Sequence, residues 1–84
     1  MKLTPELLRV KFQEGLERRT AELFTLIDAG DADGIYRAFH SLAGIGGTFG
    51  FPEVTALARE GEATRDRDRQ RTLVRRIIAT AAPR

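Results

Sequence analysis

The sequence contains no cysteine and only one histidine among its 84 residues. Without cysteine, neither a disulfide nor a thiolate metal site can hold the fold together. A single histidine also cannot close a tetrahedral zinc site built from nitrogen and sulfur ligands. Apolar runs are a few residues long, which predicts no membrane-spanning helix, and the charged N-terminal stretch is not typical of a secretory signal. We therefore expect a cytoplasmic protein with no metal of its own and no membrane partner.

The chain is 42% apolar and 31% charged, which is typical of one small globular domain. A chain of this size buries only about 60–65% of the surface that it would expose unfolded, so nothing is left to build a second core. We expect residues 1–84 to form a single domain. The initial Met1 favours a chain that stands alone over a domain cut from a longer kinase, and the sequence leaves the oligomeric state open.

Capping and turn residues divide the chain into four helical segments. A capping hydroxyl or carboxylate, or a proline in the first turn, marks each start. The predicted starts are Thr4-Pro5, Asp31 or Asp33, Phe51-Pro52, and Asp66 or Asp68. Gly30 is predicted to end the first helix, and the stretch from Gly47 to Gly50 the second, because glycine adopts the left-handed conformation found at helix ends.

Apolar residues within these segments recur every three or four positions, which is the period of a helix. The predicted inward stripes are Leu8, Phe12, Leu16, Leu23 and Ile27; Ile35, Ala38, Leu42, Ile45 and Phe49; Val54, Leu57, Ala58 and Gly61; and Leu73, Val74, Ile77, Ile78 and Ala81. No segment alternates apolar and polar residues as a strand would. We predict an all-α fold, an antiparallel up-down-up-down four-helix bundle, because short turns favour antiparallel neighbours. A three-helix bundle with a frayed end is the alternative.

His40 is the most informative residue of the chain. On a helix that turns about 100° per residue, four residues lie within about 60° of it: Tyr36, Ala43, Gly44 and Gly47. The apolar stripe of the same helix lies roughly on the opposite side. We therefore expect the imidazole to point away from the core, framed by small side chains that leave it open to a large partner. A solvated histidine without a function is the alternative that this geometry leaves open.

The run from His40 to Phe51, HSLAGIGGTFGF, resembles the signature of histidine phosphotransfer (HPt) domains, which contains His-x-Leu-Lys-Gly. Its Gly-Thr-Phe-Gly-Phe ending is similar to the phosphotransfer domain of chemotaxis-type histidine kinases. The resemblance covers about residues 7–65. It implies a four-helix bundle whose second helix presents a phosphorylatable histidine.

By this resemblance, His40 accepts a phosphoryl group from a histidine kinase or from the aspartate of a response-regulator receiver domain, and passes it on. Glu62 falls where the chemotaxis-type domains carry a glutamate that hydrogen-bonds the histidine. Such a bond would hold the proton on Nδ1 and leave Nε2 as the nucleophile. We expect no cofactor and no independent enzyme activity, because the sequence has no nucleotide-binding glycine loop and no acidic cluster for Mg²⁺, which the partner would supply.

Two positions depart from the family pattern. Ala43 stands where the family has a lysine, a cation that contributes to the electrostatics of the site. Arg37, three residues before His40, is the candidate substitute for that charge. Gly61 stands where the family often has a larger apolar residue, which predicts a loss of packing.

The predicted docking surface for a receiver domain surrounds the histidine, because small residues let an aspartate approach and charged rims orient the partner. Besides Arg37, it comprises Tyr36, Ser41, Ala43, Gly44, Gly47 and Thr48. For Thr48, a structural role in capping the glycine-rich turn is an equal alternative.

Two other functions remain open from the sequence. The first is a scaffold that binds a receiver or a kinase without accepting phosphate, and Ala43 is its support. The second is an arginine-rich helical module that binds nucleic acid through Arg65, Arg67, Arg69, Arg71, Arg75 and Arg76. Neighbouring acids offset part of that charge, the formal net charge is only +2, and aromatic residues for stacking are absent there, so we do not expect a nucleic-acid partner.

Overall fold

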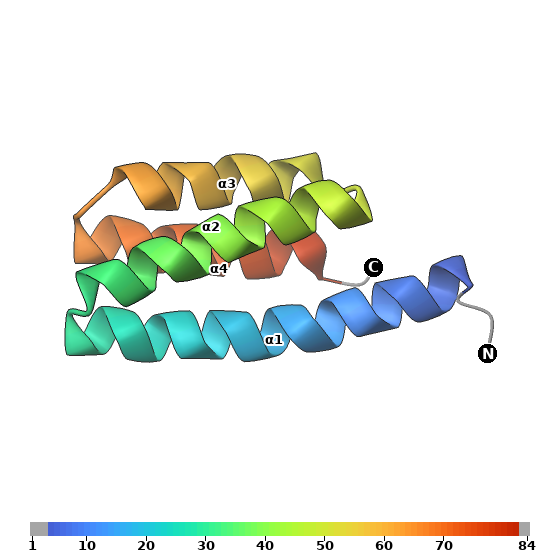
Figure 1. Cartoon of the computed structure of the whole chain (residues 1–84), viewed down its shortest axis with the longest axis horizontal. Helices are drawn as coiled ribbons and strands as arrows, with labels where there is room; N and C mark the ends of the chain where they lie inside the picture. The colour runs from blue at the N-terminus through green and yellow to red at the C-terminus, as the bar shows by residue number, and fades with distance from the viewer. Residues whose placement is uncertain (1–3, 83–84) are drawn as a thin grey trace.

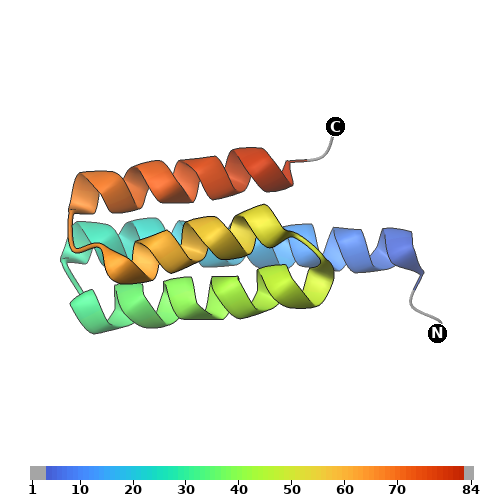
Figure 2. The ribbon, with the colours of Figure 1, turned by 90° about the horizontal axis from the view of Figure 1, so that it is seen from above.

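The computed structural model describes residues 4–82, which form four α-helices: α1 (Pro5–Ala29), α2 (Ala32–Phe49), α3 (Pro52–Ala63) and α4 (Arg67–Ala81). The described residues include no strand, so the prediction of an all-α chain with four helices is confirmed and the three-helix alternative is wrong. Consecutive helices lie side by side and run in opposite directions (Figures 1 and 2). Each helix packs against the next along the chain and α1 packs against α4, whereas within residues 4–82 the backbones of the two diagonal pairs, α1 with α3 and α2 with α4, do not approach closely.

The helix ends follow from the capping residues. The Thr4 hydroxyl accepts a hydrogen bond from the N–H of Leu7, and the Asp31 carboxylate accepts one from Gly34, which settles the choice between the two aspartates at the start of α2. Gly30 and Gly50 end the first two helices with φ of +70° and +79°, a conformation that glycine adopts without strain. These short, well-capped connections fix where each helix faces its neighbour.

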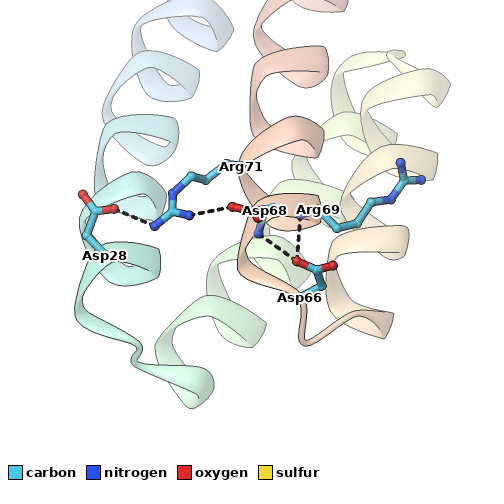
Figure 3. Close-up of polar contacts among 5 residues, drawn as sticks. All are labelled: Asp28, Asp66, Asp68, Arg69 and Arg71. Carbon is cyan, nitrogen blue, oxygen red and sulfur yellow. Dashed lines mark hydrogen bonds and ion pairs between the residues drawn. The ribbon is translucent and has the colours of Figure 1, made fainter.

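Figure 3 shows the start of α4 and its link to α1. The carboxylate of Asp66 accepts hydrogen bonds from the backbone N–H groups of Asp68 and Arg69, so Asp66 is the cap of α4. The guanidinium of Arg71 lies between Asp28 of α1, at 3.1 Å, and Asp68, at 3.2 Å. This bridge pairs the end of α1 with the first turn of α4.

Most of the predicted apolar stripes form the core. Its buried hydrophobic residues are Phe12, Leu16, Leu23, Ile27, Ile35, Phe39, Leu42, Ala43, Val54, Leu57, Ala58, Leu73, Val74, Ile77 and Ala81. Leu8, Phe49 and Ile78 were predicted to face inward, but each is exposed, at 36%, 36% and 40%. Leu8 belongs to the first turns of α1, and these turns extend beyond the ends of the other helices (Figure 1).

The buried side of α2 is turned toward α3 relative to the prediction. Phe39, Ala43 and Gly46 are buried, whereas Ala38 and Ile45 are only partly buried. The reason is the close approach of α3: a Cβ on Gly46 would lie 2.6 Å from the Thr55 hydroxyl and 3.0 Å from its backbone nitrogen. The small residues of α2 therefore face the neighbouring helix as well as the solvent.

Gly61 is not a packing defect, contrary to the prediction. A Cβ at this position would lie 2.4 Å from the ring of Phe39, which is fully buried. The aromatic ring fills the volume that the family's larger residue would occupy, and glycine is what allows it. Phe39 and Gly61 each precede a residue of the predicted site, so this contact sets the distance between α2 and α3 there.

Candidate functional site

His40 and Glu62 form a hydrogen-bonded pair across α2 and α3. The distance from His40 Nδ1 to Glu62 Oε1 is 2.9 Å. The histidine side chain is 68% exposed, whereas that of the glutamate is 15% exposed. A carboxylate can only accept, so the proton of this bond lies on Nδ1. In the neutral imidazole, Nε2 then carries the lone pair, and it has no hydrogen-bond partner among residues 4–82.

The imidazole has one covered side and one open side along α2. Tyr36, one turn before it, stacks nearly parallel to the ring, with 6.0 Å between the ring centroids and 12° between the planes. One turn after it, a Cβ on Gly44 would meet no atom within 4 Å, and two turns after it, a Cβ on Gly47 would meet only the Thr55 hydroxyl, at 3.9 Å. The surface at Gly44 and Gly47, on the side of the histidine toward the C-terminal end of α2, is therefore open.

Arg37 and Ser41 lie on the other flank of the histidine, toward α1. Both are exposed and both line a groove of about 530 Å³ between α1 and α2, together with Arg18 and Arg19. Glu62 is not part of this groove. The candidate substitute for the missing lysine therefore stands beside the histidine but on the side opposite its hydrogen bond to α3.

Of the predicted docking surface, Ala43 differs from its prediction, whereas Thr48 is compatible with both of its predicted roles. Ala43 is only 4% exposed, and the expectation that it shares the open face of His40 is wrong. It lies under α3, where the hydroxyl of Thr55 donates to its carbonyl oxygen at 2.8 Å. Thr48 is exposed and its hydroxyl donates to the carbonyl of Gly44 at 3.0 Å, a contact within the last turns of α2.

Sequence reasoning missed the residues that support the pair from below. Phe39 lies four residues after Ile35 and three before Leu42, so the helical period alone would have placed it in the core. The fit of its ring against Gly61 carries no comparable signal, because it depends on how closely two helices approach. Among the described residues, no set of three histidine, aspartate or glutamate side chains is placed to hold a metal ion.

The arginine-rich segment is partly neutralised by ion pairs. Arg69 pairs with Glu60 at 3.0 Å, and Arg71 pairs with two aspartates. Two of the six arginines of the segment are therefore paired with acids. Within residues 4–82, no helix has the length and apolar character needed to cross a bilayer.

Four helices with a solvent-exposed histidine held by a glutamate from the next helix form the arrangement that the sequence led us to expect of a histidine phosphotransfer domain. Residues 7–82 match the family model described as the Hpt domain, and the chain belongs to this family. No curated protein and no solved structure matches the chain. The family has a histidine phosphotransfer role in two-component signalling, in which its members carry phosphate between histidine kinases and response regulators without being catalysts themselves. The match extends past the stretch of residues 7–65 that carried the resemblance in the sequence and includes α4.

Proposed function

We propose that His40 is the phosphoacceptor of a phosphorelay, and that Nε2 is the atom that forms the bond to phosphorus. The observation that carries this proposal is the pairing of Nδ1 with Glu62 at 2.9 Å in a side chain that is 68% exposed. A neutral imidazole is a nucleophile only through the nitrogen that lacks the proton. Glu62 holds the proton on the inner nitrogen and so directs the lone pair toward solvent, where a partner can reach it.

The transfer step balances without a further reactant. The Nε2 lone pair attacks the phosphorus of an aspartyl phosphate on a receiver domain, the P–N bond forms, and the P–O bond to the aspartate breaks. The carboxylate leaves with the bonding electrons and stays on the receiver. The imidazole becomes positively charged while its proton remains on Nδ1, and the Glu62 carboxylate stabilises this charge. Transfer to the next aspartate is the reverse of the same step.

The partner supplies the rest of the chemistry in this proposal. Phosphoryl transfer requires a metal ion and fixed positive charge around the phosphoryl oxygens. We assign Mg²⁺ and the reacting aspartate to the receiver domain, or Mg²⁺ and ATP to a histidine kinase. In this proposal, the antiparallel bundle presents His40 to these partners on one long face. The chain and its partners work in the cytoplasm, where ATP is supplied.

The docking surface in this proposal centres on the open side of the histidine. Tyr36, Ser41, Gly44 and Gly47 contribute exposed surface on α2, and Thr48 extends it toward the end of the helix. Ala43 contributes backbone only, because its side chain is buried. Arg37 lies on the rim, where a positive charge attracts the phosphorylated partner and orients it.

The experiment that tests the proposal is incubation with a phosphorylated receiver domain or with an active histidine kinase and ATP. Phosphate on histidine is labile in acid and stable in base, which distinguishes it from phosphate on serine or aspartate. We expect such label on the wild-type chain and none on His40→Gln. Equal labelling of both would refute the proposal. Binding of the receiver to the wild type without any labelling would instead support the scaffold function.

A further inference from the structure

Helix α1 is longer than the bundle that it belongs to. At 1.5 Å per residue, its 25 residues span about 37 Å, whereas the 15 residues of α4 span about 22 Å. Its first turns extend beyond the other helices (Figures 1 and 2). Val10, in the second turn of α1, is 51% exposed. An isolated helix of two or three turns is marginal in water, and an exposed valine adds nothing to its stability, so this end of α1 lacks the packing that supports the rest.

A groove runs along α1 from this extension. It consists of two adjoining hollows of about 590 and 420 Å³ that share Gln13, Glu17 and Ala82. The first hollow is lined mainly by α1 and the end of α4, and the second continues past Ala21 and Phe24 with Ile78 on its other side. The groove thus begins beside Val10 and leads to Ile78, two of the most exposed large hydrophobic residues of the chain.

The charged residues along this face of α1 could pair with the same face of a second α1 helix. Arg9 lines the groove at the extended end, and Glu14 and Glu17 line it one and two turns further along. None of the three makes an ion pair within residues 4–82. If the helix is placed antiparallel to a second α1, with the two-fold axis at Gln13, each Arg9 lies opposite the Glu17 of the other helix. A two-fold interface requires a patch that complements itself in this way.

We propose that a second copy of this chain occupies the groove, and that the two α1 helices pack antiparallel about Gln13. The extension of each copy lies along the groove of the other and covers its rim at Ala21 and Ile78, and this contact also buries the Val10 of the extension itself. Two pairs of Arg9 with Glu17 set the register. This interface does not involve His40, because the α1–α4 face lies across the bundle from the contact between α2 and α3. The proposed dimer presents two histidine faces to partners.

Sedimentation equilibrium on the full chain tests the dimer, and charge reversal tests its register. We expect the wild type to sediment at twice the 9.4 kDa chain mass. Arg9→Glu and Glu17→Arg each place like charges opposite each other at both ends of the interface. Each should raise the dissociation constant at least about tenfold, as expected when two attractive surface pairs become repulsive. An equimolar mixture of the two variants should dimerise like the wild type, because every pair across the interface is then of opposite charge.

Three controls separate this interface from other effects. Arg59→Glu makes the same charge change on α3 and should dimerise like the wild type. His40→Gln should also dimerise like the wild type, which shows that the dimer does not depend on phosphotransfer. Val10→Asp, at an exposed position that the fold tolerates, should abolish the dimer while circular dichroism shows an unchanged helical content. A monomeric wild type at millimolar concentration would overturn the proposal. So would variants that remain dimeric, or a mixture that stays monomeric.

Discussion

The ring of Phe39 occupies the space into which any side chain at Gly61 would project, with only 2.4 Å between a Cβ there and the ring. The two residues immediately precede His40 and Glu62. Their contact lets α2 and α3 approach closely, and the hydrogen bond of 2.9 Å lies directly above it. The pairing of the histidine thus depends on a glycine that makes no contact with the imidazole itself.

Gly61→Ala should destabilise the fold because its methyl group and the Phe39 ring cannot share this volume. Overpacking of a core costs about 1–3 kcal/mol, and the better helix propensity of alanine returns up to about 1 kcal/mol. We expect a net decrease of about 1–2 kcal/mol in the free energy of unfolding, measured by urea denaturation. Gly44→Ala is the matched control: its methyl group enters open space, so the same measurement should show an increase of about 0.5–1 kcal/mol.

A double variant checks that the ring is the cause. Phe39→Leu removes the part of the ring that lies against Gly61. It should therefore lower the free energy of unfolding less in the Gly61→Ala background than in the wild type, because the two residues are in contact. Additive effects of the two substitutions would contradict this explanation.

Glu62→Ala should remove the hydrogen bond that holds the imidazole of His40 in one tautomer. Without the acceptor, the proton exchanges between Nδ1 and Nε2, and the ring turns freely on an exposed surface. We expect the ¹⁵N shifts of the ring to change from a single tautomer to a mixture, and phosphorylation to slow by between about tenfold and hundredfold. Glu60→Ala is the control, because Glu60 pairs with Arg69 and does not contact the histidine. Unchanged ring shifts in Glu62→Ala would show that the glutamate does not set the tautomer.

Arg37→Ala should slow transfer from a phosphorylated receiver by about threefold to tenfold, through the association rate, because a rim charge acts mainly on encounter. Arg59→Ala, which removes the same charge from α3, should have a smaller effect. Rapid-quench kinetics at two salt concentrations would measure both, and the Arg37 effect should shrink at high salt. Equal effects of the two substitutions would remove Arg37 from the site.

The arginines of α4 should not bind nucleic acid. Pairing of Arg69 and Arg71 with neighbouring acids offsets part of the basic charge, and the net charge of the chain is only +2. In low salt, we expect no binding to duplex DNA or to single-stranded RNA with a dissociation constant tighter than about 10⁻⁴ M, the weak end of non-specific binding. Fluorescence anisotropy measures this directly, and an affinity that falls steeply with salt would contradict the expectation.

The sequence predicted the helices and their caps, because these depend on local chemistry and on helical spacing. The pairing of His40 with Glu62 was implied by the resemblance to the HPt family, and the structure places the two side chains 2.9 Å apart. The sequence placed Ala43 on the exposed face and judged Gly61 a defect, and both predictions were wrong for the same reason. The close approach of α2 and α3 shifts the buried face of α2 toward α3. How closely two helices approach depends on the fit between both surfaces, so the periodicity of either segment alone does not predict it. Ile78 was also predicted to be buried but is exposed, because apolar periodicity does not distinguish a position in the core from one at its edge.

The most direct test of the account is the position of the phosphoryl group after treatment with phosphoramidate, which donates phosphate without a partner protein. Nuclear magnetic resonance of the ¹⁵N-labelled chain can detect the coupling between phosphorus and the ring nitrogens of His40. The account predicts coupling to Nε2, with the proton retained on Nδ1 and bonded to Glu62. Coupling to Nδ1, or a chain whose histidine stays unmodified while free histidine reacts, would contradict it.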